Sequence, residues 1–115
     1  MKIQKFQDIV AWQKAKEFNL ISYKTFQKCK DYYFRDQFLR AALSIMNNIA
    51  EGFDRQSDKE FKQFLYIAKG SNSEVKSMLY LAVEFGHINQ QDFELLNNLS
   101  EDIGRLLFGF IRSIS

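Results

Sequence analysis

The chain contains no proline, and it has only one cysteine and one histidine among its 115 residues. Folds rich in loops usually place several prolines in their turns, so the absence of proline favours long helices joined by short connections. The single cysteine, Cys29, allows neither an intrachain disulfide nor a paired-cysteine metal site, and it fits a reducing compartment. One histidine and one cysteine cannot supply a closed metal site, so we expect no metal and no cofactor.

Long apolar runs are also missing. No segment approaches the 18 apolar residues of a membrane span, and the first residues lack the apolar region of a signal peptide. We therefore expect a cytoplasmic protein with no membrane partner. The sequence has no P-loop, GxGxxG motif or nucleophile elbow, so we expect neither an enzyme nor a small-molecule substrate.

Neither sign of charge is in large excess, since the net charge is only +2. Its distribution is uneven: residues 1–30 carry a net charge of +5, residues 31–83 are neutral, and residues 84–115 carry −3. A basic end could bind RNA or another acidic partner, although the total is far from that of a typical nucleic-acid-binding domain. The two charged ends could equally pair between copies of the chain in an oligomer.

Apolar side chains are abundant, at 46% of the residues, and twelve of them are phenylalanine. They recur at helical spacing in four segments, which predicts helices at about residues 8–28, 34–54, 57–85 and 90–114. Ser57 and Glu60 form a capping-box pattern at the start of the third, and Gly86 is typical of a helix end. The short loops favour a single all-α domain, an antiparallel up-down-up-down four-helix bundle.

The buried face of the first helix is predicted at Trp12, Ala15, Asn19, Ser22 and Phe26, with Ile9 and Tyr23 at its border. The inner faces of the other helices are wide and rich in leucine, isoleucine and phenylalanine. Val10, Ile21 and Phe108 fall outside the core stripes. Scattered apolar residues are ordinary on protein surfaces, but a contiguous patch marks subunit contacts, and we favour a homo-oligomer.

Four segments carry motifs in a fixed order along the chain. They are FQDIVAWQKA at residues 6–15, QFLRAA at 37–42, SIMNNIAEG at 44–52 and SDKEFKQFLYIAKGS at 57–71. Together they resemble the 23S rRNA intervening-sequence protein family, also called four-helix-bundle proteins, whose signature is SIPxNIAEG. The departure is Met46, where the family usually has proline. Methionine keeps the backbone donor there, so we expect a straighter second helix than in relatives.

The resemblance implies a four-helix bundle, and some members of the family form barrel-like homopentamers. Members can be encoded within insertions of the large ribosomal RNA gene. A related accessory protein of diversity-generating retroelements associates with a reverse transcriptase and nucleic acid. The resemblance therefore implies two kinds of partner, which are further copies of the chain and either RNA or a nucleic-acid-processing protein.

A polar set on the second helix recurs at steps of three and four residues, so its members lie along one helix face. This set, the signature set, comprises Gln37, Arg40, Ser44, Asn48, Glu51 and Arg55. It could form a groove for a ligand or RNA. It could also be a hydrogen-bonded seam between helices or subunits, which is the commoner arrangement and the one that we favour.

Lysines on the third helix recur every seven residues, with tyrosines on the same outer face. This lysine–tyrosine stripe comprises Lys62, Tyr66, Lys69, Lys76 and Tyr80. Such a stripe can track phosphates and stack bases, although lysines on a helix are more often a solvated face. Lys14, Lys24 and Lys28 form a similar set on the first helix. If assembly brings the two sets together, several subunits would strengthen a weak patch.

His87 and Cys29 are the remaining candidates for chemistry. A lone histidine in a turn is far more often a capping or surface residue than a catalyst, and Cys29 has no evident partner and suits a small, partly buried site. The favoured hypothesis is a homo-oligomeric, non-enzymatic adaptor that binds RNA or a nucleoprotein. The alternative is a protein–protein interaction module with no nucleic-acid role, in which outer apolar residues capture the partner.

Overall fold

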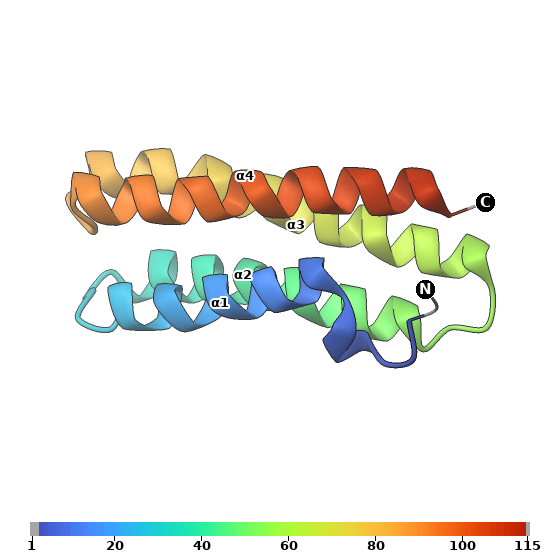
Figure 1. The fold of residues 1–115 in the computed structure, drawn as a ribbon. Helices are drawn as coiled ribbons and strands as arrows, with labels where there is room; N and C mark the ends of the chain where they lie inside the picture. The colour runs from blue at the N-terminus through green and yellow to red at the C-terminus, as the bar shows by residue number, and fades with distance from the viewer. Residues whose placement is uncertain (1–2, 115) are drawn as a thin grey trace.

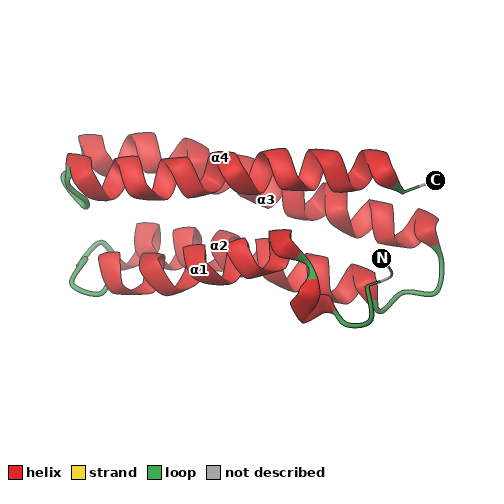
Figure 2. Ribbon diagram, in the orientation of Figure 1, coloured by secondary structure: helices red, strands yellow, loops and turns green. Residues whose placement is uncertain are grey.

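The computed structural model describes residues 3–114, and all the regular structure in that range is helical (Figure 2). A short 3₁₀ helix, η1 (Phe6–Asp8), precedes α1 (Val10–Thr25), α2 (Tyr32–Phe53), α3 (Asp58–Glu84) and α4 (Gln90–Ser113). The prediction of an all-α chain with four long helices is therefore confirmed. Among the described residues, no helix has the length and apolar character needed to cross a membrane.

Side-chain caps begin three of the four helices. Asp31, Ser57 and Asn89 each accept a hydrogen bond from the backbone N–H three residues later, at 3.2, 3.2 and 2.7 Å. The cap at Asp31 starts α2 two residues before the predicted start at residue 34. The first helix is shorter than predicted at both ends. Residues 6–8 form η1 and Ile9 is extended before α1 begins, and α1 ends at Thr25, so Lys28 lies in the turn that follows.

Gly86 ends α3, as the sequence predicts, in a backbone conformation with a φ of 78°. Its N–H donates to the carbonyl of Val83 at 3.1 Å, and the N–H of His87 donates to the carbonyl of Ala82 at 2.9 Å. This pair of bonds is a Schellman motif, which glycine favours because it has no Cβ to oppose a positive φ. The turn brings the chain directly into the cap at Asn89.

The four helices lie side by side in a body of 43 × 22 × 19 Å, and the chain reverses at each loop (Figure 1). The loops after α1 and after α3 lie at one end of the molecule, and the loop after α2 lies at the other. Each helix packs against two neighbours. Among the described residues, α1 contacts α2 and α4 but not α3, so α1 and α3 lie diagonally across the core.

The predicted inner faces of α2, α3 and α4 are buried or partly buried, but the prediction for α1 is partly wrong. The fully buried large side chain at the centre of α1 is Phe18, whose ring stacks on Phe38 with centroids 6.0 Å apart. Tyr23 is exposed rather than at the core border, and Ile21 packs against the core rather than outside it. The five residues predicted for the inner face are buried or partly buried, so the error lies in the omission of Phe18 and at the borders of the face.

Candidate partner-binding surfaces

The middle of the signature set joins α2 to α3. The hydroxyl of Ser71 on α3 donates to the hydroxyl of Ser44 on α2 at 2.8 Å. The amide nitrogen of Asn48 donates to the hydroxyl and the carbonyl oxygen of Ser44, at 2.9 and 2.8 Å. These groups are partly buried and satisfy one another, which favours the packing interpretation over a ligand groove for Ser44 and Asn48.

The ends of the signature set lie differently. Glu51 and Arg55 form an exposed ion pair at 3.2 Å, and the Arg55 guanidinium also lies 4.6 Å from the ring centroid of Phe64 on α3. Gln37 is half-buried and Arg40 is exposed. The structure therefore divides the six residues into an interhelical seam and two more accessible ends, rather than one continuous groove.

The lysine–tyrosine stripe lies beside α4, where two of its members already have partners. The ammonium of Lys76 donates to the Glu101 carboxylate at 2.9 Å, and the rings of Tyr80 and Phe93 meet edge to face at 5.1 Å between centroids. The hydrogen bond from Lys76, with the charge of the ammonium, lowers the pKa of Glu101. Tyr66 and Lys69 are exposed, and Lys62 is half-buried.

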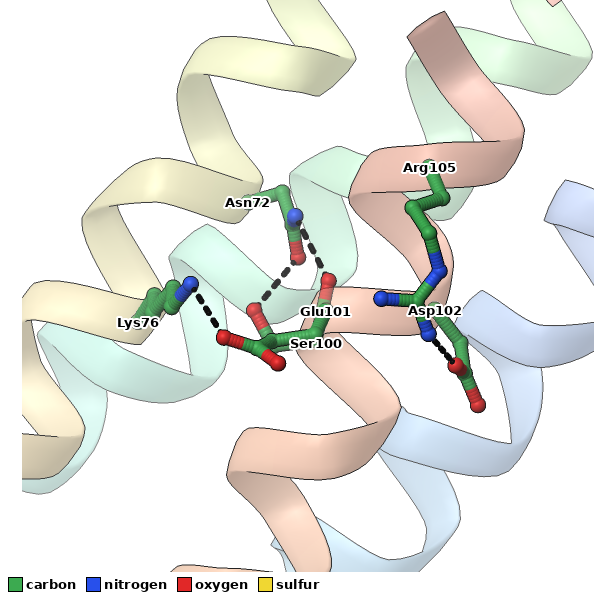
Figure 3. Close-up of polar contacts among 6 residues, drawn as sticks. All are labelled: Asn72, Lys76, Ser100, Glu101, Asp102 and Arg105. Carbon is green, nitrogen blue, oxygen red and sulfur yellow. Dashed lines mark hydrogen bonds and ion pairs between the residues drawn. The ribbon is translucent and has the colours of Figure 1, made fainter. Parts of the chain in front are cut away.

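A polar surface groove of about 320 Å³ lies between α3 and α4 beside Lys76. It is lined in part by Lys69, Lys76, Glu101 and Arg105. Arg105 pairs with Asp102 on its own helix (Figure 3). Positive and negative charges are therefore mixed along the groove. This mixture opposes binding of a polyanion more than a purely basic surface would.

Beneath this groove, a buried pair locks α3 to α4. The amide of Asn72 donates to the carbonyl oxygen of Ser100 at 3.0 Å, and the Ser100 hydroxyl donates back to the Asn72 amide oxygen at 2.9 Å (Figure 3). Sequence analysis missed this pair, although both residues occur at core-facing positions of otherwise apolar stripes. A polar residue at such a position is a signal of a buried hydrogen bond.

The lysines of α1 and of the turn after it are less neutralised than those of α3. Lys24 and Lys28 are exposed and Lys14 is half-buried, and within residues 3–114 none of the three forms an ion pair. Since α1 and α3 lie diagonally across the core, the two lysine sets do not adjoin within one chain. Any surface that combines them requires a second copy.

An apolar groove of about 410 Å³ runs between α1 and α2 on the outside of the molecule. It is lined by Leu20, Tyr23, Leu39, Leu43 and Met46, together with Lys16, Lys24 and the partly buried Asn19. The amide of Asn19 donates to the carbonyl oxygens of Ala15 on α1 and Ala42 on α2, each at 2.8 Å. Sequence analysis did not predict this groove, although three of its residues recur on α2 at spacings of four and three.

At the end of the molecule that holds two loops, Asp31 contacts His87, with 3.0 Å between Oδ2 and Nε2. The backbone N–H of Phe34 and then His87 hold the pKa of Asp31 below its usual value. The imidazole also lies against the rings of Phe34 and Phe85, and the Cys29 thiol lies 3.8 Å from the carbonyl oxygen of Asp31. His87 thus ties two loops together. No set of three potential metal ligands gathers among the described residues.

Comparison with known proteins identifies relatives of this arrangement. A family model described as 23S rRNA-intervening sequence protein matches residues 7–109. A solved structure of a protein of unknown function from the S23 ribosomal protein family of Bacteroides thetaiotaomicron is similar, with a TM-score of 0.82 and 30% sequence identity. The match covers 88% of this chain and 97% of that one. No curated protein matches.

Proposed function

This chain belongs to the 23S rRNA-intervening sequence protein family, and from that premise we propose that it is a non-enzymatic adaptor that binds RNA or a nucleoprotein. Its working form is a homo-oligomer of antiparallel up-down-up-down four-helix bundles in the cytoplasm. The family's homopentamers make five the expected number of subunits. No catalytic role is assigned to His87, because its Nε2 contacts Asp31 and its ring packs against Phe34 and Phe85, which joins two loops.

The observation that carries the RNA proposal is the cationic surface of α1 and the turn that follows it. Lys14, Lys24 and Lys28 have no carboxylate partner within the described residues, whereas Lys76 on α3 is paired with Glu101. A free ammonium group gains more from a phosphate than one that must first give up an ion pair. We therefore place the principal RNA contacts on α1, with the lysine–tyrosine stripe of α3 as the second surface.

A titration with structured ribosomal RNA at two salt concentrations tests the proposal. Each lysine–phosphate contact contributes about 0.7 to 0.9 to the slope of log affinity against log salt. Replacing Lys14, Lys24 and Lys28 together with glutamine should lower that slope by about 2 to 3. The matched replacement of Lys62, Lys69 and Lys76 should lower it less. Affinity that is absent, or that salt does not change, would show that RNA is not the partner.

The α1–α2 groove favours the second candidate function, a protein–protein interaction module. Its exposed leucines and Met46 offer contact area without the donors that phosphate binding requires. On this alternative, the variant with glutamine at Lys62, Lys69 and Lys76, which lie outside the groove, captures a protein partner as well as the wild type does. Substitution in the groove abolishes capture. The two functions therefore predict opposite sets of affected residues.

A further inference from the structure

We infer that the α1–α2 groove is the docking site for the outer ridge of α3 from a second copy of this chain. The outer ridge is defined by Ile67, Glu74 and Leu81. This inference rests on the homo-oligomer of the proposed function, and it names the two surfaces that form the contact. RNA and unrelated proteins are the competing occupants of the groove, and the experiment below separates them.

The lining of the groove favours an apolar occupant. Leu20, Tyr23 and Leu43 expose about half of their surface or more, and they adjoin one another along a single concave strip. Contiguous apolar surface of this kind is costly to leave in water and marks a contact site. Both N–H groups of the Asn19 amide already donate to backbone carbonyl oxygens, so Asn19 has no free donor for a ligand in the groove.

The outer ridge has the shape to fill such a strip. Ile67, Glu74 and Leu81 are spaced seven residues apart, so they lie in one line along α3, about 10.5 Å from one to the next. Ile67 and Leu81 are exposed, as is Glu74 between them. Gly70 lies on the helical turn between Ile67 and Glu74, and no neighbouring atom lies within 4 Å of its Cβ position. The helices α1 and α2 of a second copy can therefore approach α3 closely there.

Charge complementarity points to a second copy rather than to RNA. Lys16 lines the groove one helical turn before Leu20 and belongs to neither proposed RNA-binding lysine set. The ridge presents the carboxylate of Glu74, and Glu84 follows at the end of the same helix. A lysine beside an apolar strip can pair with a carboxylate that interrupts an apolar ridge, which sets the register of the contact.

The positions of the two surfaces determine the symmetry of the assembly. The groove lies on α1 and α2, and the ridge lies on α3, which is diagonal to α1. One copy can therefore offer its groove to one neighbour and its ridge to another. A contact between two different surfaces is heterologous, and it closes into a ring when the rotation per subunit divides a full turn.

Two single-site variants test this inference by mixing. Leu43→Glu disables the groove and Leu81→Glu disables the ridge, at residues that are 48% and 45% exposed, so neither should disturb the core. We expect each variant alone to have the 13.6 kDa mass of one chain by light scattering, whereas the wild type forms a larger particle. Mixed in equal amounts, the variants should form a heterodimer of twice that mass, because one intact groove meets one intact ridge.

The control is Leu95→Glu on α4, a leucine of matched exposure at 49% that lies outside both surfaces. It should leave the particle mass unchanged. Circular dichroism of every variant verifies that the helices are intact. Variants that remain oligomeric, or a mixture that stays monomeric, would overturn the inference while leaving the oligomer of the proposed function standing. A monomeric wild type would overturn both, and RNA binding by the wild type is measured separately.

Discussion

Gly52 allows α2 and α3 to approach closely at the end of the signature segment. A Cβ atom at this position would lie 2.6 Å from the Cβ of Phe64 and 3.0 Å from Cδ1 of Phe61. Since the Cβ of Phe64 is fixed to its backbone, the helices must separate to admit a methyl group. We expect Gly52→Ala to lower the free energy of unfolding by about 1–3 kcal/mol, despite the better helix propensity of alanine. Urea unfolding measures the change.

Gly70 supplies the matched control for that substitution. It occupies the interior of α3, and nothing lies within 4 Å of its Cβ position. Gly70→Ala should therefore raise the free energy of unfolding of the monomeric form by about 0.5–1 kcal/mol through helix propensity alone. Because the control bears on intrachain packing, both substitutions are measured in the monomeric Leu43→Glu background. Equal effects at the two glycines would show that close helix approach is not the reason for Gly52.

Asn19 bears on the proline that the family usually has at position 46. A proline there removes the N–H that bonds the carbonyl of Ala42 in a regular helix. In this chain the Asn19 amide already donates to that same carbonyl at 2.8 Å. We expect Met46→Pro to cost less than the usual ~3 kcal/mol, and to cost about 0.5–1.5 kcal/mol more when Asn19 is alanine. A double-mutant cycle measures this coupling, and simple additivity would contradict it.

Between elements, the Asn72–Ser100 pair is the buried polar link of α3 to α4. Both side chains are excluded from water, so removing one leaves the other without a partner. Asn72→Ala should lower the free energy of unfolding by about 1–3 kcal/mol. Asn72→Leu combined with Ser100→Ala should recover most of that loss, because it removes both polar groups. Chemical unfolding of the wild type and both variants measures these differences. A double variant that is less stable than Asn72→Ala would contradict this prediction.

The contact of Asp31 with the α2 N-terminus and His87 predicts a dependence of stability on pH. The Phe34 amide and His87 lower the pKa of Asp31 in the folded chain. Its carboxylate therefore contributes stability above the unfolded pKa of about 3.9, and this contribution is lost as the pH falls through the folded value. Asp31→Asn keeps a capping acceptor but removes the charge. The advantage of the wild type over this variant should shrink below about pH 4.

Urea midpoints between pH 2 and 7 measure that advantage. Asp54→Asn, at the exposed C-terminal cap of the same helix, is the control. The same change at Asp54 touches neither the Phe34 amide nor His87, so it controls for the substitution itself. An advantage of Asp31 over asparagine that persists unchanged to pH 2 would mean that the charge of the carboxylate contributes nothing at this cap.

Periodicity and capping residues predicted the helices well, and the surfaces between them less well. Ser57, Gly86 and Asn89 act through bonds within a few residues, so their roles follow from local sequence. The direction of the inner face of α1 does not follow from local sequence, because it depends on which α1 side chain packs against Phe38 of α2. The α1–α2 groove likewise arises from two helices meeting, and neither helix alone indicates it. The candidate binding residues could be named from sequence, but their ion pairs and their diagonal separation could not.

At the scale of the whole molecule, the diagonal placement of α1 and α3 limits what one copy can bind. An RNA strand that lies along the lysines of α1 cannot also contact the lysine–tyrosine stripe of the same copy, because the core lies between the two helices. The proposed assembly through the groove and the ridge would repeat each lysine set around the particle. Linked weak sites of this kind can gain 10²–10⁴ in overall affinity without any new contact.

Leu43→Glu therefore provides the test of whether assembly makes the RNA-binding surface. The variant keeps every lysine of both sets but should be monomeric, and we expect its affinity for structured ribosomal RNA to fall by roughly 10²-fold. Leu81→Glu should also be monomeric but lies outside the α1–α2 groove, so it should lose affinity to the same extent, whereas Leu95→Glu should keep wild-type affinity. A larger loss in Leu43→Glu than in Leu81→Glu would indicate repulsion of RNA by the new carboxylate near Lys24. Fluorescence anisotropy at two salt concentrations measures these affinities. If monomeric Leu43→Glu binds as tightly as the wild type, a single copy suffices and the assembly serves another purpose.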